Sequence, residues 1–506
     1  MAAGPLYKVV RTQLTTVGPI PLGLGCKMMP TGLDELVAQA RGDFARLNFP
    51  APNWVPALTG PDGQTMLDVL VIGAGLCGQT AGFALARDGV RNVRIVDLAE
   101  RGREGPWGTY ARMDTLRSPK QLTGPDLGFP ALTFRAWYEA QHGAEGWRRL
   151  YKIATGDWLN YLLWVRDTVG LSIENNTEVT RIDPKPNGLR IELVGPSGAQ
   201  TLFARKVVLA GGRDGSGAPD RPAFPSLPAD SRGQFARVFH SSDAINFARL
   251  AGGKIGILGA SASAFDNAAV ALESGAAEAH LFVRRTHLPQ VNKSKWTAFP
   301  GFFLGFRQLD DRRRWQIYSY IFAQAVPPPH ESVLRCERHP GFSVHFAEPW
   351  LDVVDGAGGV KVVTAKACYL FDAVIMATGF SVDLTQRREL ARCHGRIALW
   401  VDRVSAQEAA AHPEAARFPY LGPGFELIER TPGILPGLSH IHAFNAGATM
   451  SHGALAGDIP GLAFGANRLS RAIASSLLKA SADALTSKLW DYDDRELEPT
   501  RYFLPR

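Results

Sequence analysis

Short, nearly continuous apolar runs alternate with longer helical stretches in two parts of the chain. Leu67 to Ile72 and Lys254 to Leu258 are such runs, and each leads through small residues into a helical stretch. Val93 to Val96 and His280 to Val283 then close the two units as second short runs. Runs of this length and composition are typical of strands buried on both faces of a parallel sheet. The pattern therefore predicts two β-α-β units within one chain.

The turn of the first unit carries the spacing G-x-G-x-x-G, formed by Gly73, Gly75 and Gly78. Gly73 permits a tight turn, Gly75 lets the backbone approach a pyrophosphate, and Gly78 lets the helix pack on the strand. The helix N-terminus then presents unpaired N–H groups to the phosphates. Asp97 ends the second strand, 24 residues after Gly73, where a carboxylate accepts hydrogen bonds from ribose hydroxyls. The unit therefore predicts a dinucleotide site.

The second unit repeats this architecture with the opposite charge. Gly259, Ser261 and Ser263 form its turn, and Arg284 and Arg285 stand where the first unit has its acid, 25 residues after Gly259. An acid suits a free ribose 2′-hydroxyl, whereas arginines suit a 2′-phosphate. We therefore expect NADPH at this unit. The alternative is that both arginines are solvated charges at the end of a strand.

Composition narrows the class of protein. The chain has 506 residues, 45% of them apolar, which is enough for two or three domains with cores of their own. It has no apolar run long enough to span a membrane and no signal-peptide pattern, so we expect a cytoplasmic protein. The net charge of +7 is spread along the chain without a basic stripe, which favours anionic cofactors over nucleic acid. The five cysteines show neither Cys-x-x-Cys nor metal-ligand spacing, so no metal site is expected.

Several motifs carry a resemblance to a known family. Trp107, within GREGPWGTY, resembles a Gly-Gly-x-Trp element, and Met113 to Pro130 is similar to a stretch that lines the flavin. His240 matches the histidine of a fingerprint that joins two domains, and residues 377–380 match a late Ala-Thr-Gly element. The chain thus resembles the class B flavin-dependent monooxygenases, which include flavin-containing, Baeyer–Villiger and N-hydroxylating enzymes. Ala244 stands where Tyr or Trp marks two of these subtypes, so no subtype is selected.

The resemblance covers roughly residues 66–480 and implies an α/β fold. We expect two Rossmann-like domains, each doubly wound and three-layered, with the NADPH domain inserted in the FAD domain. The expected ranges are 1–65 for an N-terminal extension, 66–215 and 372–506 for the FAD domain, and 216–371 for the NADPH domain, with an aromatic-rich helical insert at 286–335. Two apolar runs, 206–209 and 373–376, each end at small residues. We expect both to be buried strands of the FAD domain, as a repeated feature.

Two helical regions outside the units are open to two interpretations each. Thr31 to Leu47 is an amphipathic stretch with Thr31 as its cap, and it is either a packing or oligomer arm or a substrate lid. The aromatic side chains of the insert form either the core of a helical subdomain or a wall of the substrate pocket. Homo-oligomerisation is left open.

The resemblance also implies the chemistry. NADPH reduces FAD, and a flavin C4a-(hydro)peroxide formed with O₂ delivers one oxygen atom to a small organic substrate by N-, S- or Baeyer–Villiger oxygenation. The alternatives are an FAD-dependent NAD(P)H oxidoreductase without oxygenation and a cofactor-binding sensor. The expected cofactor-binding residues are Gly73, Gly75, Gly78, Asp97, Trp107, Gln121, Val179, Gly259, Ser261, Ser263, Arg284, Arg285, Thr378 and Gly379. The expected catalytic residues are Arg117, Lys120 and Gln121, and residues 444–461 are expected to close over the flavin.

Overall fold

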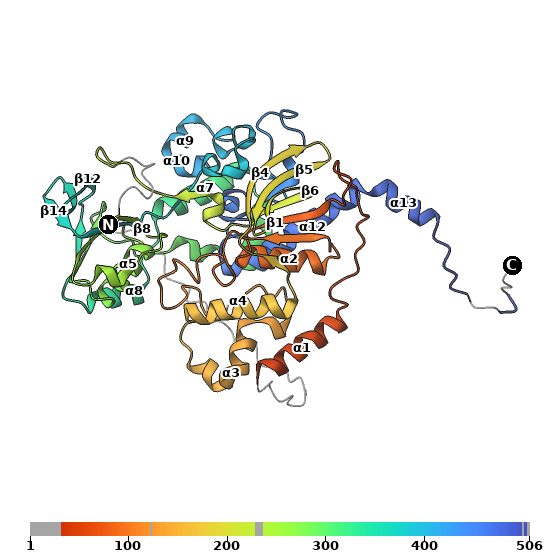
Figure 1. The fold of residues 1–506 in the computed structure, drawn as a ribbon, viewed down its shortest axis with the longest axis horizontal. Coiled ribbons are helices and arrows are strands. Elements are labelled where there is room, and N and C mark those ends of the chain that lie inside the picture. Colours follow the sequence, from red (N-terminus) through yellow and green to blue (C-terminus); the bar gives the residue numbers. More distant parts are fainter. Residues whose placement is uncertain (1–31, 122–123, 228–235, 498–499, 503–506) are drawn as a thin grey trace, which may run out of the picture.

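A computed structural model describes residues 32–121, 124–227, 236–497 and 500–502 of the chain. Two mainly parallel sheets dominate it, with helices packed on both, so the predicted α/β class with two Rossmann-like domains is confirmed. In Figure 1 the second sheet lies at the left and the first sheet to the right of the centre.

The first sheet has seven strands, in the order β3-β2-β1-β6-β5-β4, with β17 paired to β6. The parallel part consists of β1 (Leu67–Ile72), β2 (Val93–Val96), β3 (Ile173–Glu174), β6 (Gly198–Leu209) and β17 (Ile441–Ala443). The antiparallel strands β4 (Glu178–Lys185) and β5 (Gly188–Gly195) extend it. Helices α2 (Leu76–Arg87) and α12 (Leu462–Ala480) bury their apolar faces in the same core as these strands. The first predicted β-α-β unit is therefore confirmed.

The second sheet has five parallel strands in the order β11-β10-β9-β15-β8. They are β8 (Val238–His240), β9 (Lys254–Leu258), β10 (Glu278–Val283), β11 (Phe342–Phe346) and β15 (Ala373–Met376). Helix α5 (Ala262–Glu273) follows β9, which confirms the second predicted unit. A three-stranded antiparallel sheet of β12 (Trp350–Gly356), β13 (Gly359–Thr364) and β14 (Cys368–Phe371) shares the hydrophobic core on one side of the second sheet.

The position of β15 corrects one prediction. We expected the strand that ends before Thr378 to belong to the same domain as β1, but β15 pairs with β9 and β8 in the second sheet. Only Asp372 separates β14 from β15, so the chain has no room to leave the domain at that point. The expected boundary at residue 372 is therefore wrong. The buried strand that ends at small residues does occur twice, but once in each sheet. β6 pairs with β1 in the first sheet, and β15 pairs with β9 in the second sheet.

The two sheets are linked by a short antiparallel pair. β7 (Gly217–Pro219) follows β6, β16 (Phe380–Val382) follows β15, and the two strands pair with each other. The carboxyl ends of the two sheets are thereby held at one junction. Ligands of open α/β sheets bind in crevices at such carboxyl ends.

A helical lobe lies below the first sheet in Figure 1. It contains α1 (Leu33–Arg46), α3 (Phe134–Arg149) and α4 (Thr155–Val169), whose buried aromatic side chains form a core of their own. Leu36, Ala40 and Phe44 of α1 are buried there, so packing explains this helix. Thr31, the predicted cap, lies outside the described residues.

The helical insert comprises α6 (Pro300–Gly305), α7 (Asp311–Gln324) and α8 (His330–Glu337). Phe302, Phe306, Trp315 and Tyr318 are buried in one cluster together with Trp400, which favours the core-packing interpretation of the insert. The short helices α9 (Ala406–Ala411), α10 (Pro413–Ala416) and α11 (Thr449–His452) complete this region.

Helix α13 (Ala482–Trp490) extends from the end of α12 at the right of Figure 1 and buries none of its residues. Within the described ranges, none of the helices has the length and apolar character needed to cross a membrane.

Candidate functional site

The three glycines of the first turn differ in how closely the surrounding protein approaches them. A Cβ on Gly73 would lie 2.8 Å from the carbonyl carbon and oxygen of Ala210, and a Cβ on Gly78 would lie 1.8 Å from the carbonyl oxygen of Gly73. Gly73 also has a φ of +100°, which favours glycine. A Cβ on Gly75, by contrast, would meet nothing closer than the Cα of Gly105 at 3.7 Å. The protein therefore requires Gly73 and Gly78 for its own packing, whereas its own contacts do not require glycine at position 75.

The start of α2 has the chemistry of a phosphate site. Gly75 is the N-cap residue, with φ −66°, and no side chain accepts a hydrogen bond from the first turn at the cap. The first N–H groups of a helix are left without intrahelical partners, and the helix dipole adds partial positive charge there. A pyrophosphate at this position would accept from these N–H groups. The residues present thus fit the diphosphate part of a dinucleotide such as FAD.

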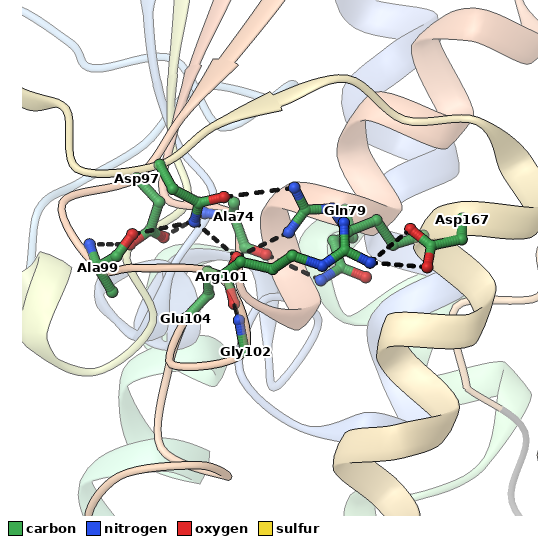
Figure 2. Close-up of polar contacts among 10 residues, drawn as sticks. Ala74, Gln79, Asp97, Ala99, Arg101, Gly102, Glu104 and Asp167 are labelled. Atoms are coloured by element: carbon green, nitrogen blue, oxygen red, sulfur yellow. Dashed lines mark hydrogen bonds and ion pairs between the residues drawn. The ribbon is translucent and has the colours of Figure 1, made fainter. Parts of the chain in front are cut away.

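Asp97 ties the end of β2 to the glycine turn, as Figure 2 shows. Its Oδ2 accepts from the backbone N–H of Ala74 at 2.6 Å, and its Oδ1 accepts from the N–H of Ala99 at 2.8 Å. Burial raises the pKa of the Asp97 carboxyl, and these two N–H groups oppose that rise. Each oxygen keeps a further lone pair, so the carboxylate can hold the turn and still accept from a ribose hydroxyl.

A buried carboxylate that the sequence analysis missed fixes the neighbouring loop. Glu104 accepts from Arg166 of α4 at 2.8 Å and from Asn175 at 2.7 Å, and its second oxygen accepts from the N–H of Gly102 at 2.6 Å. Figure 2 places Glu104 and Gly102 beside Asp97 and Ala99. Glu104 and Arg166 are each about 5% exposed or less, so the ion pair is shielded from water. The only sequence signal was an acid two residues after Gly102, which spacing does not distinguish from a solvated charge.

The turn of the second unit repeats the geometry of the first. Gly259 has a φ of +140°, and a Cβ on it would lie 2.6 Å from the carbonyl oxygen of Ala377, as Gly73 faces Ala210. Ser261 is the N-cap of α5, and its side chain makes no cap hydrogen bond. The second turn therefore also offers free N–H groups at a helix start.

The arginines that follow β10 lie at the end of that strand, as expected. Arg284 and Arg285 are both exposed, and the side chain of Arg285 reaches the carbonyl oxygen of Ala323 at 3.4 Å. Their placement fits the expected contact with a ribose 2′-phosphate, which stays a prediction.

Two of the expected catalytic residues, Arg117 and Lys120, make contacts of different kinds. Arg117 lies at the junction of the sheets and forms an ion pair with the buried Asp266 of α5 at 3.1 Å. Burial lowers the pKa of Arg117, and the charge of Asp266 opposes that fall. Lys120 instead donates to the carbonyl oxygens of Trp147 and Leu150 at the end of α3, where cations stabilise the helix. Its contacts are those of a helix C-cap, so the expected catalytic role of Lys120 has no support in the structure.

The remaining predicted residues are spread around the first sheet. Trp107 packs on Trp158 of the helical lobe, with ring centroids 6.2 Å apart, Gln121 is exposed, and Val179 is buried in β4. Thr378 and Gly379 instead follow β15 of the second sheet, where the carbonyl oxygen of Gly379 contacts Nε2 of His240, the last residue of β8, at 3.0 Å.

The segment 444–461 passes the start of α2. The thiol of Cys77, in the first turn of α2, contacts the carbonyl oxygen of Ala456 at 3.7 Å, and the N–H of Ala446 donates to Gly212 at 3.3 Å. The segment therefore lies against both the first turn of α2 and the loop that follows β6, and its closing over the flavin stays a prediction.

Comparisons with known proteins agree with this geometry. A family model described as pyridine nucleotide-disulphide oxidoreductase matches residues 70–298, which contain both glycine turns. The chain is 42% identical over 468 residues to the FAD-dependent urate hydroxylase of Xanthomonas campestris pv. campestris, covering 92% of this chain and 97% of that protein.

Solved structures share the fold at low sequence identity. The ornithine hydroxylase of Pseudomonas aeruginosa superposes with a TM-score of 0.63 and 18% identity, over 81% of this chain and 100% of that one. The cadaverine monooxygenase of Erwinia amylovora, solved with FAD bound, superposes with a TM-score of 0.60 and 15% identity, over 88% and 99%. The arrangement of two Rossmann-like domains is therefore common to all three chains.

Proposed function

The chain belongs to the family of flavin-dependent monooxygenases that contains the FAD-dependent urate hydroxylase, and we propose that it likewise hydroxylates urate, using FAD and NADPH. It is an oxidoreductase. The overall reaction consumes urate, O₂, NADPH and a proton, and yields hydroxylated urate, water and NADP⁺. One oxygen atom enters the substrate and the other leaves as water, so the electrons of NADPH balance the reaction.

The single observation that carries the cofactor assignment is that no contact among the described residues requires glycine at position 75. The other two glycines of the turn are required by contacts within the protein, and this one is not. We assign the pyrophosphate of FAD to the approach to Gly75, with the backbone N–H groups of residues 75–78 at the start of α2 as its donors and Asp97 as the ribose partner. The second turn, Gly259 to Ser263, would hold NADPH, with Arg284 and Arg285 at its 2′-phosphate.

FAD supplies the activation of O₂ once NADPH has reduced it. The chain itself orients the cofactors and excludes water. The junction held by β7 and β16 brings the carboxyl ends of both sheets together, where the two cofactors would meet. No side-chain nucleophile is needed for this reaction.

Urate as the substrate rests on the relative alone. The resemblance implies N-, S- or Baeyer–Villiger oxygenation of a small organic molecule, and no motif in the sequence points to a purine. The match extends over nearly the full length of both chains, which supports a shared substrate more strongly than a match confined to the cofactor domains would.

Among the reductases without oxygenation, the disulfide reductases are disfavoured by the described cysteines, and a reductase with another acceptor, such as a quinone, stays as the alternative. Dithiol chemistry needs a thiolate, and burial raises the pKa values of Cys77, Cys336 and Cys393 to about 12. Cys368 is exposed and is a free thiol, like the other three described cysteines.

A coupled assay tests the proposal. Purified, FAD-loaded protein is mixed with NADPH and urate in air, and O₂ uptake, NADPH absorbance and urate are followed together. We expect urate-dependent consumption of the three compounds in a 1:1:1 ratio. NADPH oxidation that proceeds under argon with a quinone acceptor, and without loss of urate in air, would instead support the reductase.

A further inference from the structure

Arginines surround the junction between the two sheets, and most of them have a clear structural partner. Arg112 donates to the backbone carbonyl oxygens of Ser241 and Asp243, the latter at 2.7 Å. Arg117 pairs with Asp266 at 3.1 Å. These two side chains hold the first domain against the second.

Arg387 is likewise engaged. It forms an ion pair with Glu389 at 2.8 Å and donates to the carbonyl oxygen of Asp214 at 2.9 Å. Arg213 differs from all of these, because no described residue accepts a hydrogen bond from its side chain or lies in ion-pair contact with it.

The backbone of Arg213 is nevertheless firmly placed. It follows β6 by three small residues, Ala210 to Gly212, and the first of these lies directly against the glycine turn of the FAD site. The N–H of Ala446 donates to the carbonyl oxygen of Gly212 at 3.3 Å, and the N–H of Gly215 donates to Gly211 at 2.9 Å. The loop around Arg213 is therefore held from both sides while its side chain is exposed.

An aromatic pair contacts the loop that carries Arg213, at the next residue. The rings of Tyr110 and Phe380 are 5.7 Å apart, and the hydroxyl of Tyr110 donates to Asp214 at 3.1 Å. Burial raises the pKa of Tyr110, and the positive charge of Arg213 opposes that rise. Burial also lowers the pKa of Arg117, and Arg213 adds to that fall, so its charge reaches both neighbours.

We propose that Arg213 binds the substrate in its anionic form, with the flat face of the substrate against Tyr110 and Phe380. The proposal rests on the proposed function, because urate is a planar purine that carries one negative charge at neutral pH. A planar guanidinium presents paired N–H donors that match adjacent nitrogen and oxygen acceptors on such a ring. Its location between the FAD turn and the second domain places a bound substrate where both cofactors meet.

Steady-state kinetics of the FAD-loaded enzyme test this role. Arg213→Gln removes the charge at similar length, Arg213→Lys keeps the charge without the paired donors, and Arg392→Gln removes another exposed arginine as a control. A lost charge-assisted hydrogen bond corresponds to a roughly ten- to hundredfold change in binding. We expect Arg213→Gln to raise the KM for urate by about that factor with a smaller change in kcat, and Arg213→Lys to recover part of it. FAD content, the KM for NADPH and Arg392→Gln should match wild type.

A pH profile adds a readout that a structural role would not move. In wild type the KM for urate should rise as the pH falls through the first ionisation of urate, because the anion disappears. In Arg213→Gln this dependence should be much flatter. An unchanged urate KM in Arg213→Gln, or a change confined to NADPH or FAD, would overturn the inference while leaving the proposed function intact. A wild-type enzyme that neither binds nor hydroxylates urate would overturn both.

Discussion

Replacing Gly75 by alanine separates cofactor binding from folding more cleanly than any other change in the first turn. Gly75 has a φ of −66°, which alanine adopts freely, and the added methyl would meet only ordinary contacts of 3.7–3.8 Å with Glu104 and Gly105. The protein without cofactor should therefore keep its stability, or gain about 0.4–1 kcal/mol from the loss of glycine's freedom in the unfolded chain. The methyl would also narrow the approach to Gly75 that we assign to the pyrophosphate.

The expected loss of FAD affinity follows from the hydrogen bonds at stake. Two N–H donors to a charged phosphate contribute roughly 1.5–3 kcal/mol each, so displacing the phosphate should weaken FAD binding by about a hundredfold or more. The ratio of FAD absorbance to protein absorbance measures loading, and a thermal melt of the cofactor-free protein measures stability. Gly78→Ala is the contrasting variant, because its Cβ would lie 1.8 Å from the carbonyl oxygen of Gly73, so it should destabilise even the free protein. Gly156→Ala, with nothing within 4 Å, is the neutral control. A fully yellow Gly75→Ala protein, or one whose free form melts as early as Gly78→Ala, would refute the reasoning.

Three further outcomes are expected. Replacing both Arg284 and Arg285 by Ala should raise the KM for NADPH by about ten- to hundredfold and leave that for NADH nearly unchanged, since only NADPH carries the 2′-phosphate; an unaltered NADPH/NADH preference would contradict the assignment. Glu104→Gln should lower the free energy of unfolding, measured by urea titration, by about 3–5 kcal/mol, because it leaves Arg166 buried without its counter-charge. The control is Glu100→Gln, which removes an exposed ion pair with Arg103 and should change the free energy of unfolding by less than about 1 kcal/mol. Burial lowers the pKa of His442 in the folded protein to about 3. As the pH falls below about 6.5, His442 is therefore protonated in the unfolded chain before it is protonated in the folded protein. The free energy of unfolding should then fall by up to about 1.4 kcal/mol per pH unit between about pH 6.5 and about pH 3. His442→Asn, which keeps a donor for the carbonyl oxygen of Gly424, should reduce that slope; equal slopes from pH 7 to 5 would disprove this origin.

The sequence predicted those parts of the fold that rest on local chemistry. Buried strands need apolar runs, and the turns that follow need glycine where backbones approach each other, so β1, β2, β9 and the two glycine turns could be found from spacing alone. Asp97 could be found because its distance from the first glycine is set by the length of a helix and a strand.

The sequence could not reveal which sheet a short strand joins. β6 and β15 have the same pattern of buried residues followed by small ones, and pairing with β1 or with β9 depends on the chain path around them. The contacts of Glu104 and Lys120 could not be predicted for a related reason. A carboxylate buried against Arg166 and a lysine that caps α3 differ from solvated charges only through distant partners, which single-sequence spacing does not contain.

The two glycine turns share one design but differ in how the protein holds them. In the first unit, Asp97 bonds to the N–H of Ala74, and Glu104 fixes the adjoining loop that lies over Gly75. In the second unit, an arginine replaces the acid, and no described carboxylate bonds to a backbone N–H of residues 259–263. A site that is already ordered loses less conformational entropy when its ligand binds, so it can retain that ligand more tightly. We therefore expect the first turn to retain its cofactor longer than the second. This division matches the roles of FAD and NADPH in the reaction that we propose.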